Sequence, residues 1–422
     1  MKKLFFISLA IILVAGMFLS GCAEPEPEPA PAPGPAPAPE PEPAPAPEKE
    51  EILVGAIVSM TGMNAMTGAD HVWAYEQAVA DINAAGGVYV EEYGKKLPIK
   101  LVIADDKSTA ADAAAAMEKL IKLEKIDLAI GTNVTPLNIA AATVVEKYKV
   151  FMANCFTWLD QFEEQNFQWA SDFFSSAPGA AEVPYQILDY QDEAMRPKAI
   201  ALLMEDNPDG QGFGDGFRMF GEKYGYNIAL DEPYTPGTKD FSSTILKIQA
   251  NDCDALFWLG SPTDSIVLIR QMKEQQLNLK YIHGWKGFWP NEFVDALGAD
   301  SNYITHDGFW AETLPYPGAK ELGQNYRDTH DGQDTVSVGI PYANVQILAQ
   351  AIEKAGSLDS AKVRDEVFGG AFDGTVMGDV QYNEKGLCSV SMLGLQWMDG
   401  QRLPVWPPGA FDLQWIPAWD QR

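Results

Sequence analysis

The sequence predicts an α/β protein built from two lobes, each with a parallel β-sheet that has helices on both faces. Two observations lead to this class. From Glu51 onward, short apolar runs typical of buried strands alternate with segments of helical period, and this alternation favours parallel sheets with right-handed crossovers. Roughly 370 residues follow the first 50, which is too many for one ordinary core and enough for two.

The first lobe begins with alternating strands and helices. The first predicted helix has apolar residues at helical spacing and ends at Gly86. In the last unit, Thr135 stands where a helix N-cap belongs, and Pro136 takes the first helical position, where its missing N–H costs nothing. The expected strands are 52–58, 99–104, 128–131 and 150–153, and the expected helices are 71–83, 110–123 and 136–147.

A second series follows a Ser/Pro/Gly-rich break at 175–179. The glycines at 210, 212, 214 and 216 miss the spacing of a nucleotide-binding loop, so they indicate a permissive turn at a helix start. The tail from Phe372 is expected to form strands and turns. The other expected strands are 199–204, 226–230, 255–259, 281–284 and 308–311, and the helices are 180–190, 213–224, 241–250, 263–275, 290–297, 318–329 and 341–355.

The start of the chain predicts a processing signal. Lys2 and Lys3 precede an apolar run, 4–19, that is too short for a stable membrane span. The run closes with Leu-Ser-Gly-Cys, which resembles the lipobox of bacterial-type lipoproteins, so residues 1–21 are expected to be a signal peptide and Cys22 to be lipidated. A plain secretory signal is the alternative. The proline-rich segment 22–50 is expected to be an extended tether.

Charge and motif spacing exclude several classes of function. The formal net charge of −29 argues against a nucleic-acid partner. The four histidines show no metal-ligand spacing, and neither a P-loop nor a G-x-S-x-G elbow occurs, so no metal, cofactor or enzymatic activity is expected. Apart from Cys22, an odd number of cysteines remains (Cys155, Cys253 and Cys388), which allows at most one disulfide and leaves the pairing open.

Several segments of the body resemble the periplasmic branched-chain amino-acid binding proteins. They are D-I-N-A-A-G-G at 81–87, D-F-S-S-T-I-L-K-I at 240–248, D-A-L-F-W-L-G at 254–260, M-T-G at 60–62 and F-G-D-G at 213–216. The resemblance runs from about residue 51 to 400. It implies a type I periplasmic-binding architecture, in which two Rossmann-like lobes are joined by a three-strand hinge and close on a ligand. The lipobox and tether fit the lipoprotein form of these receptors.

The resemblance also implies where the lobes begin and end. Lobe 1 is expected at 51–175 plus 308–377, and lobe 2 at 179–306 plus 378–422. The three crossings between the lobes are expected near 174–178, 306–310 and 377–380.

A ligand site is expected at the start of the helix 136–147. A helix start presents free N–H groups and the positive end of its dipole, and hydroxyls at neighbouring strand ends suit a carboxylate. The resemblance implies the individual residues. They are Thr135 and Thr157 for the ligand carboxylate, Phe156 beside Thr157, Thr67 from a first-lobe loop, and Phe213 and Ser261 from the second lobe.

One position departs from the family pattern. Relatives that bind α-amino acids use an acidic residue for the ammonium after the strand 281–284, where this chain has Trp285 and Lys286. A lysine repels an ammonium and favours a second anionic group. Either Asp206, Asp209 or Asp264 supplies the missing charge, or the ligand is not an amino acid. The nearby aromatic residues that could box a ring are Trp158, Trp258, Trp285, Phe288 and Trp289.

These observations favour a lipid-anchored extracytoplasmic substrate-binding protein of an ABC importer, in the periplasm or on the cell surface. It is expected to act as a monomer, to capture a small carboxylate-bearing solute between its lobes, and to deliver the solute to the permease subunits. The solute is a branched-chain or other amino acid, or an aromatic or dicarboxylic acid. A surface receptor of the same fold that signals to a membrane partner is the alternative, and a hydrolase is disfavoured because no nucleophile–base pair is visible.

Overall fold

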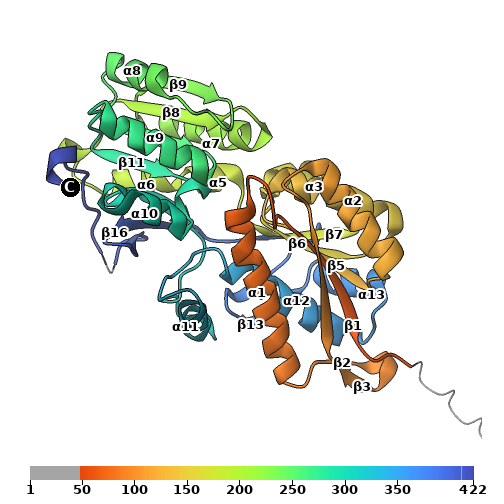
Figure 1. The fold of residues 1–422 in the computed structure, drawn as a ribbon. Helices are drawn as coiled ribbons and strands as arrows, with labels where there is room; N and C mark the ends of the chain where they lie inside the picture. The colour runs from red at the N-terminus through yellow and green to blue at the C-terminus, as the bar shows by residue number, and fades with distance from the viewer. Residues whose placement is uncertain (1–47, 410) are drawn as a thin grey trace, which may run out of the picture. The chain divides into compact units, whose positions relative to one another are not determined.

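The computed structural model describes residues 48–409 and 411–422. These residues form two α/β lobes, each built around one sheet, so the predicted class is confirmed (Figure 1). The expected signal peptide, the lipidated Cys22 and nearly all of the tether lie outside the described residues. No helix among the described residues combines the length and the apolar character needed to cross a membrane.

The first lobe is organised around a six-stranded, fully parallel sheet with the order β15-β7-β6-β5-β1-β4. Its strands are β1 (Ile52–Val58), β4 (Ile99–Asp105), β5 (Leu128–Ile130), β6 (Met152–Cys155), β7 (Ala170–Phe174) and β15 (Leu387–Ser389). Its helices are α1 (Ala65–Ala84), α2 (Ala110–Lys119), α3 (Thr135–Tyr148), α4 (Leu159–Gln165), α12 (Gly339–Ala355) and α13 (Ser360–Val367). Two short hairpins pair β2 (Val88–Val90) with β3 (Lys95–Leu97) and β13 (Ala371–Thr375) with β14 (Gly378–Gln381).

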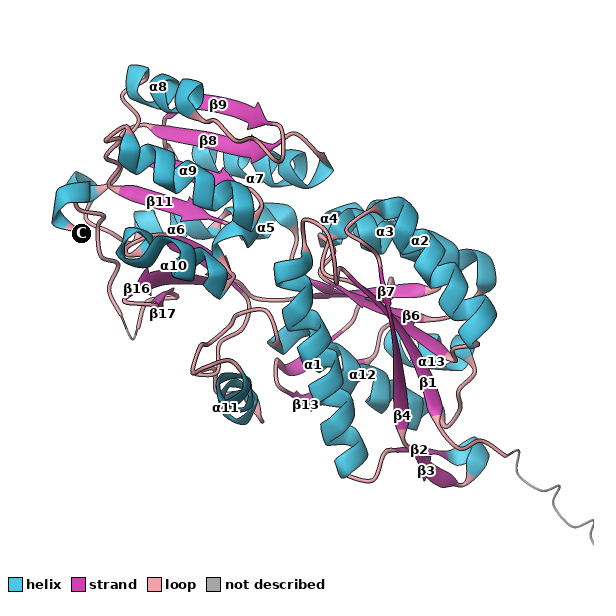
Figure 2. Ribbon diagram, viewed as in Figure 1, coloured by secondary structure: helices cyan, strands magenta, loops and turns pink. Residues whose placement is uncertain are grey.

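The second lobe is organised around a seven-stranded sheet with the order β17-β16-β12-β11-β10-β8-β9, in which only β16 and β17 run antiparallel to their neighbours (Figure 2). Its strands are β8 (Ile200–Glu205), β9 (Ile228–Tyr234), β10 (Ala255–Leu259), β11 (Tyr281–Gly284), β12 (Thr305–Gly308), β16 (Leu393–Met398) and β17 (Gln401–Trp406). Its helices are α5 (Ala177–Ala181), α6 (Val183–Asp189), α7 (Pro208–Tyr224), α8 (Ser242–Ala250), α9 (Pro262–Glu274) and α10 (Asn291–Leu297).

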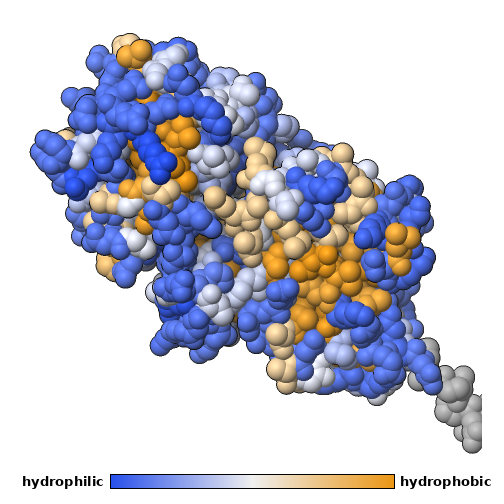
Figure 3. Space-filling model, viewed as in Figure 1, coloured by the Kyte–Doolittle hydropathy of each residue, from blue (hydrophilic) through white to orange (hydrophobic). Residues whose placement is uncertain are grey.

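The central strands of both sheets are buried on both faces, which is why they read as continuous apolar runs in the sequence. Every residue of β6, β7, β8 and β10 is buried. The edge strand β4 is mostly half-buried. Most of the face seen in Figure 3 is hydrophilic, and an apolar area lies over the first lobe beside α1.

The glycine-rich segment lies inside α7 and not at a turn before it, so the predicted helix start at 213 is wrong. The Asn207 side chain caps the helix by accepting a hydrogen bond from the Gly210 N–H at 2.9 Å. A Cβ atom at Gly216 would lie 2.7 Å from the Ala181 Cβ and 2.9 Å from the Pro178 Cα. Glycine at that position therefore allows α7 to pack closely against α5.

Three connections join the lobes. The first runs from β7 directly into α5, and the second leaves β12 and reaches α12 through α11 (Ala319–Thr329). The third joins β15 to β16 through residues 390–392, and not near 377–380 as predicted. The reason is that β15 pairs in parallel with β7 of the first sheet, with Leu387 opposite Asp172. Residues 378–389 therefore belong to the first lobe.

Several element boundaries also differ from the prediction. The first helix begins at Ala65, six residues early, because the chain turns at Gly62 with a positive φ of 89°. The strand expected at 308–311 is β12 and ends at Gly308. The expected helix 180–190 is divided into α5 and α6, and Pro184 lies at the start of α6.

Candidate functional site

A hollow between the two lobes is lined at the carboxyl ends of strands from both sheets. The space not filled by atoms is about 440 Å³, including the part open to solvent. Ligands of open α/β sheets bind at this edge. The lining residues are Asn64, Thr67, Asn133, Val134, Thr135, Phe156, Trp158 and Phe174 from the first lobe, and Asp209, Pro262, Trp285, Lys286 and Trp289 from the second.

Five aromatic side chains form the apolar wall of the hollow. The ring of Trp158 in the first lobe lies 5.1 Å from that of Trp285 in the second, measured between centroids. Trp285 lies 4.9 Å from Trp289, and Phe156 stacks on Phe174 at 4.7 Å. All five are buried. Such a wall excludes water and suits a flat, apolar ligand body.

The start of α3 forms the polar end of the hollow. Val134 is extended and provides no side-chain cap, so Thr135 is the first helical residue, and its predicted role as N-cap is wrong. The preceding turn is held instead by Asn138, whose Oδ1 accepts a hydrogen bond from the Thr132 N–H at 2.7 Å. The Thr135 Oγ1 accepts one from the Trp158 N–H at 3.3 Å, which leaves its own proton for a ligand. The positive end of the helix dipole at this start favours an anion.

Thr67 and its neighbours close the polar end. Thr67 lies in the first turn of α1, and not in a loop as predicted, because α1 begins before it. Its hydroxyl donates to the Asn64 carbonyl at 3.0 Å and accepts from the Asn133 Nδ2 at 2.7 Å. The Thr67 hydroxyl is therefore engaged within the protein and holds Asn133 at the hollow.

Lys286 is held between two carboxylates. Its Nζ donates to the Asp209 Oδ2 at 2.6 Å and to the Glu205 Oε2 at 2.9 Å. Burial lowers the pKa of Lys286, but the attraction of Asp209 and Glu205 outweighs burial, so the pKa lies above the ordinary value of a lysine. Lys286 is therefore charged, and its charge is already balanced by the carboxylates of Asp209 and Glu205. The expectation that it presents a free positive charge to the ligand is therefore wrong.

Asp209 also connects the two lobes. Its Oδ1 accepts a hydrogen bond from the indole Nε1–H of Trp158, which belongs to the first lobe. Of the three acids considered as partners for a ligand ammonium, Asp209 alone lines the hollow. Asp206 is exposed, and the Asp264 Oδ2 accepts from the Gly237 N–H at 2.9 Å.

Thr157 does not reach the hollow. Its side chain is fully buried, and its Oγ1 accepts a hydrogen bond from the Asn154 Nδ2 at 2.7 Å. The residue before it, Phe156, adopts a positive φ of 62°, and Phe156 lines the hollow in place of Thr157. A left-handed residue at a strand end could not be read from the sequence pattern.

Phe213 and Ser261 also lie outside the hollow. Phe213 packs behind Trp285, with ring centroids 5.1 Å apart. Ser261 is the N-cap of α9, and its Oγ accepts a hydrogen bond from the Asp264 N–H at 3.2 Å. Phe213 thus supports the second-lobe wall from behind, whereas Ser261 fixes the start of α9.

Sequence reasoning missed five lining residues, which are Asn64, Asn133, Val134, Phe174 and Pro262. For some of these residues, their position directly after a predicted strand was a signal that could have identified them. Asn133 and Val134 directly precede Thr135 in the loop after β5, and Pro262 follows Ser261 after β10. Position after a strand end is a better guide to a lining residue than the chemical type of its side chain.

A buried histidine lies behind the aromatic wall. The ring of His71 packs against that of Phe156, with centroids 4.5 Å apart. Its Nδ1 contacts the Thr67 carbonyl oxygen at 3.2 Å, so this nitrogen carries the proton and donates it. Burial lowers the pKa of His71 to about 3, so the ring is neutral at pH 7.

In the part of the chain that the structure describes, no group of three or more His, Cys, Asp or Glu side chains is placed to hold a metal. Cys155, Cys253 and Cys388 are free and buried. Cys155 and Cys388 lie on β6 and β15, which are separated by β7, so a disulfide between them is out of reach.

The chain is similar to known proteins at the level of sequence. The sequence pattern of the family described as "Periplasmic binding protein" matches residues 51–401. An "Amino acid binding protein" of Pseudomonas aeruginosa is 27% identical over 343 residues, covering 81% of this chain and 88% of that protein.

Two solved structures share the fold. A branched-chain amino acid transporter substrate binding protein of Streptococcus pneumoniae, in complex with isoleucine, has a TM-score of 0.74 at 22% identity and covers 84% of this chain and 98% of its own. A solute binding protein of an ABC transporter from R. palustris, in complex with 4-hydroxybenzoate, has a TM-score of 0.69 at 19% identity and covers 84% of this chain and 95% of its own.

The buried position of Lys286 predicts a large effect of Lys286→Met on stability. The substitution leaves Asp209 and Glu205 as two unpaired, buried carboxylates, and breaking a buried ion pair in this way costs about 3–5 kcal/mol. Urea unfolding at pH 7 should show a loss of that size in the free energy of unfolding.

The matched control is Lys247→Met. Lys247 pairs with Glu232 at the same 2.6 Å distance as Lys286 with Asp209, but half of its side chain is exposed. Surface pairs contribute less than about 1 kcal/mol. Equal losses in the two variants would show that burial of Lys286 is not the source of its effect.

The lowered pKa of His71 predicts that acid destabilises the fold. The unfolded chain takes up this proton at pH about 6.5, whereas the folded chain does so only near pH 3, so stability is full above pH 6.5 and is lost as the pH falls toward 3. Between pH 7 and pH 5 this one group removes about 2 kcal/mol from the free energy of unfolding. Urea unfolding at both pH values should show the difference shrinking by that amount in His71→Gln. An unchanged difference would mean that His71 titrates normally.

Proposed function

Because the chain belongs to the periplasmic binding protein family, we propose that it is the substrate-binding protein of an ABC importer and captures a small aromatic carboxylate. One observation carries the proposal: a hollow between the two lobes has an aromatic wall on one side and the start of α3 on the other. In the part of the chain that the structure describes, three connections of the backbone join the lobes, so hinge closure around the ligand is the expected motion.

The ligand carboxylate is proposed to lie at the start of α3. The Thr135 hydroxyl can donate to it, and the positive end of the α3 dipole favours an anion. Asn133 lies at the same end, where its Nδ2 donates to the Thr67 hydroxyl and the Asn64 carbonyl. The carboxylate is thus recognised by the Thr135 hydroxyl and a helix dipole, without a free cation.

The body of the ligand is proposed to lie against the indoles of Trp158, Trp285 and Trp289. Indole and phenyl faces bind flat rings through offset and edge-to-face contacts. The ammonium of an α-amino acid would need a free carboxylate. Among the described residues, Asp209 is the only acidic one that lines the hollow, and it already accepts hydrogen bonds from Lys286 and Trp158. The site therefore favours an aromatic acid over leucine.

Two further considerations bear on the ligand class. The solute binding protein from R. palustris, which shares the fold, was solved in complex with 4-hydroxybenzoate, and this supports an aromatic acid as the ligand class. A dicarboxylic acid is disfavoured because Lys286 is neutralised by Glu205 and Asp209. A ring hydroxyl opposite the carboxylate could donate to a remaining lone pair of Asp209.

Isothermal titration calorimetry tests the ligand class. We expect 4-hydroxybenzoate or a close aromatic acid to bind at least about tenfold tighter than leucine, isoleucine or valine, because no free carboxylate receives their ammonium. Thr135→Val should weaken aromatic-acid binding roughly tenfold or more, since a hydrogen bond to a charged group is lost.

Thr143→Val is the matched control. Thr143 lies on the same helix, is exposed, and donates to the Ile139 carbonyl at 2.9 Å, away from the hollow. The affinity of Thr143→Val for the aromatic acid should equal that of the wild type. Leucine binding tighter than every aromatic acid would overturn the proposed ligand class.

The lipid anchor remains part of the proposal, together with the permease partner and the monomeric state. Leu-Ser-Gly-Cys at the end of the apolar run is the feature that supports anchoring through Cys22. In a lipoprotein-processing bacterium, Cys22→Ser should move the protein from the membrane fraction to the soluble extracytoplasmic fraction. Immunoblots of the two fractions would show this, and membrane retention of the variant would refute the anchor.

A further inference from the structure

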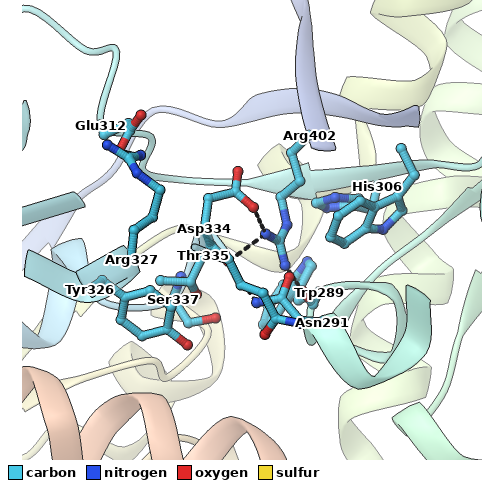
Figure 4. Close-up of polar contacts among 12 residues, drawn as sticks. Trp289, Asn291, His306, Glu312, Tyr326, Arg327, Asp334, Thr335, Ser337 and Arg402 are labelled. Atoms are coloured by element: carbon cyan, nitrogen blue, oxygen red, sulfur yellow. Dashed lines mark hydrogen bonds and ion pairs between the residues drawn. The ribbon is translucent and has the colours of Figure 1, made fainter. Parts of the chain in front are cut away.

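Two neighbouring residues on the second connection between the lobes bind opposite lobes. Asp334 and Thr335 follow α11 and precede α12. Asp334 contacts the second lobe and Thr335 contacts the first. Figure 4 shows Asp334 facing Arg402, with the Glu312–Arg327 ion pair nearby on the same connection.

On the second-lobe side, Asp334 is held by a buried arginine. Only 2% of the Arg402 side chain is exposed. Its guanidinium donates to the Asp334 carbonyl at 2.7 Å and to the Asp334 carboxylate, and it also donates to the main-chain carbonyl of Trp289. It lies 4.0 Å from the ring centroid of Trp397. Asn291 adds a second donor to the Asp334 carbonyl, at 2.7 Å.

On the first-lobe side, both oxygens of Asp70 are engaged by this connection. The Thr335 hydroxyl donates to the Asp70 Oδ2 at 2.7 Å, and the Tyr326 hydroxyl donates to the Oδ1 at 2.7 Å. Asp70 lies on α1, one helical turn after Thr67, which lines the hollow. The contact therefore ties the connection to the helix that borders the candidate site.

The two halves of this bridge differ in how readily they break. Arg402 is a buried charge that would lose the carboxylate and the carbonyl of Asp334, and leaving such a charge unpaired is strongly unfavourable. Asp70 is half-buried and can exchange its hydroxyl donors for water. Separation of the lobes should therefore break the Asp70 contacts and leave the Arg402 contacts in place.

We propose that Asp334 and Thr335 form a latch between the lobes, anchored by Arg402 and released at Asp70, that sets how readily the ligand hollow opens. Arg402 joins the latch to the hollow because the same guanidinium holds the backbone of Trp289, part of the aromatic wall. The link to ligand affinity rests on the proposed function. The control of lobe opening does not depend on it.

Thr335→Val tests the latch with little risk to folding, because it keeps the shape of the side chain and leaves Arg402 paired. Hydrogen–deuterium exchange of the ligand-free full chain, read by mass spectrometry, should become roughly tenfold faster in Thr335→Val at the two segments that line the hollow, 131–137 and 284–291. Thr335→Ser retains the hydroxyl and should restore the wild-type rate. The affinity for 4-hydroxybenzoate, measured by calorimetry, should fall roughly tenfold in Thr335→Val and recover in Thr335→Ser.

Arg327→Gln is the control on the same connection, because Arg327 pairs with Glu312 and not with either sheet. It should leave exchange at both segments unchanged. Faster exchange confined to 334–338 in Thr335→Val, or an equal rise in Arg327→Gln, would overturn the latch. If 4-hydroxybenzoate does not bind the wild type while exchange responds as expected, the proposed ligand fails and the latch stands.

Discussion

The position of one ammonium group governs the geometry of the cleft. Lys286 forms ion pairs with both Asp209 and Glu205 at the edge of the second sheet, and Asp209 also accepts the indole N–H of Trp158 from the opposite lobe. Without the lysine, two like charges would face one another away from water. The aromatic wall, the approach of the lobes and the charge of the hollow all follow from this arrangement.

The cleft is held together at two separate places by different chemistry. Near the ligand hollow, the lobes meet through rings and through the Trp158–Asp209 hydrogen bond. Farther along the second connection, Asp334 and Thr335 meet the lobes through polar side chains. Rings favour a dry, closed site, whereas half-buried polar contacts can exchange with water. This division suits a protein that must both hold a solute and let it go.

Much of the fold could be predicted from the sequence, because strand–helix alternation and the spacing of the resembling segments depend on local patterns. The third connection could not, since the pairing of β15 with β7 joins residues that are more than two hundred positions apart. The site was predictable where position alone decides, as for Thr135 and Lys286. It was not predictable for Thr157, where the left-handed backbone of Phe156 decides which side chain lines the hollow. The contacts that link Asp70, Asp334 and Arg402 to the second connection join distant parts of the chain, so no local sequence pattern could predict them.

The crowding of three indoles at the meeting point of the lobes has an optical consequence. Trp158, Trp285 and Trp289 are buried and lie within about one ring diameter of their neighbours. The emission of an indole depends on the polarity around it and on adjacent quenching groups, and the Asp209 carboxylate contacts one of these three. A change in the separation of the lobes should therefore alter the intrinsic fluorescence of the protein, which carries its own reporter of lobe separation.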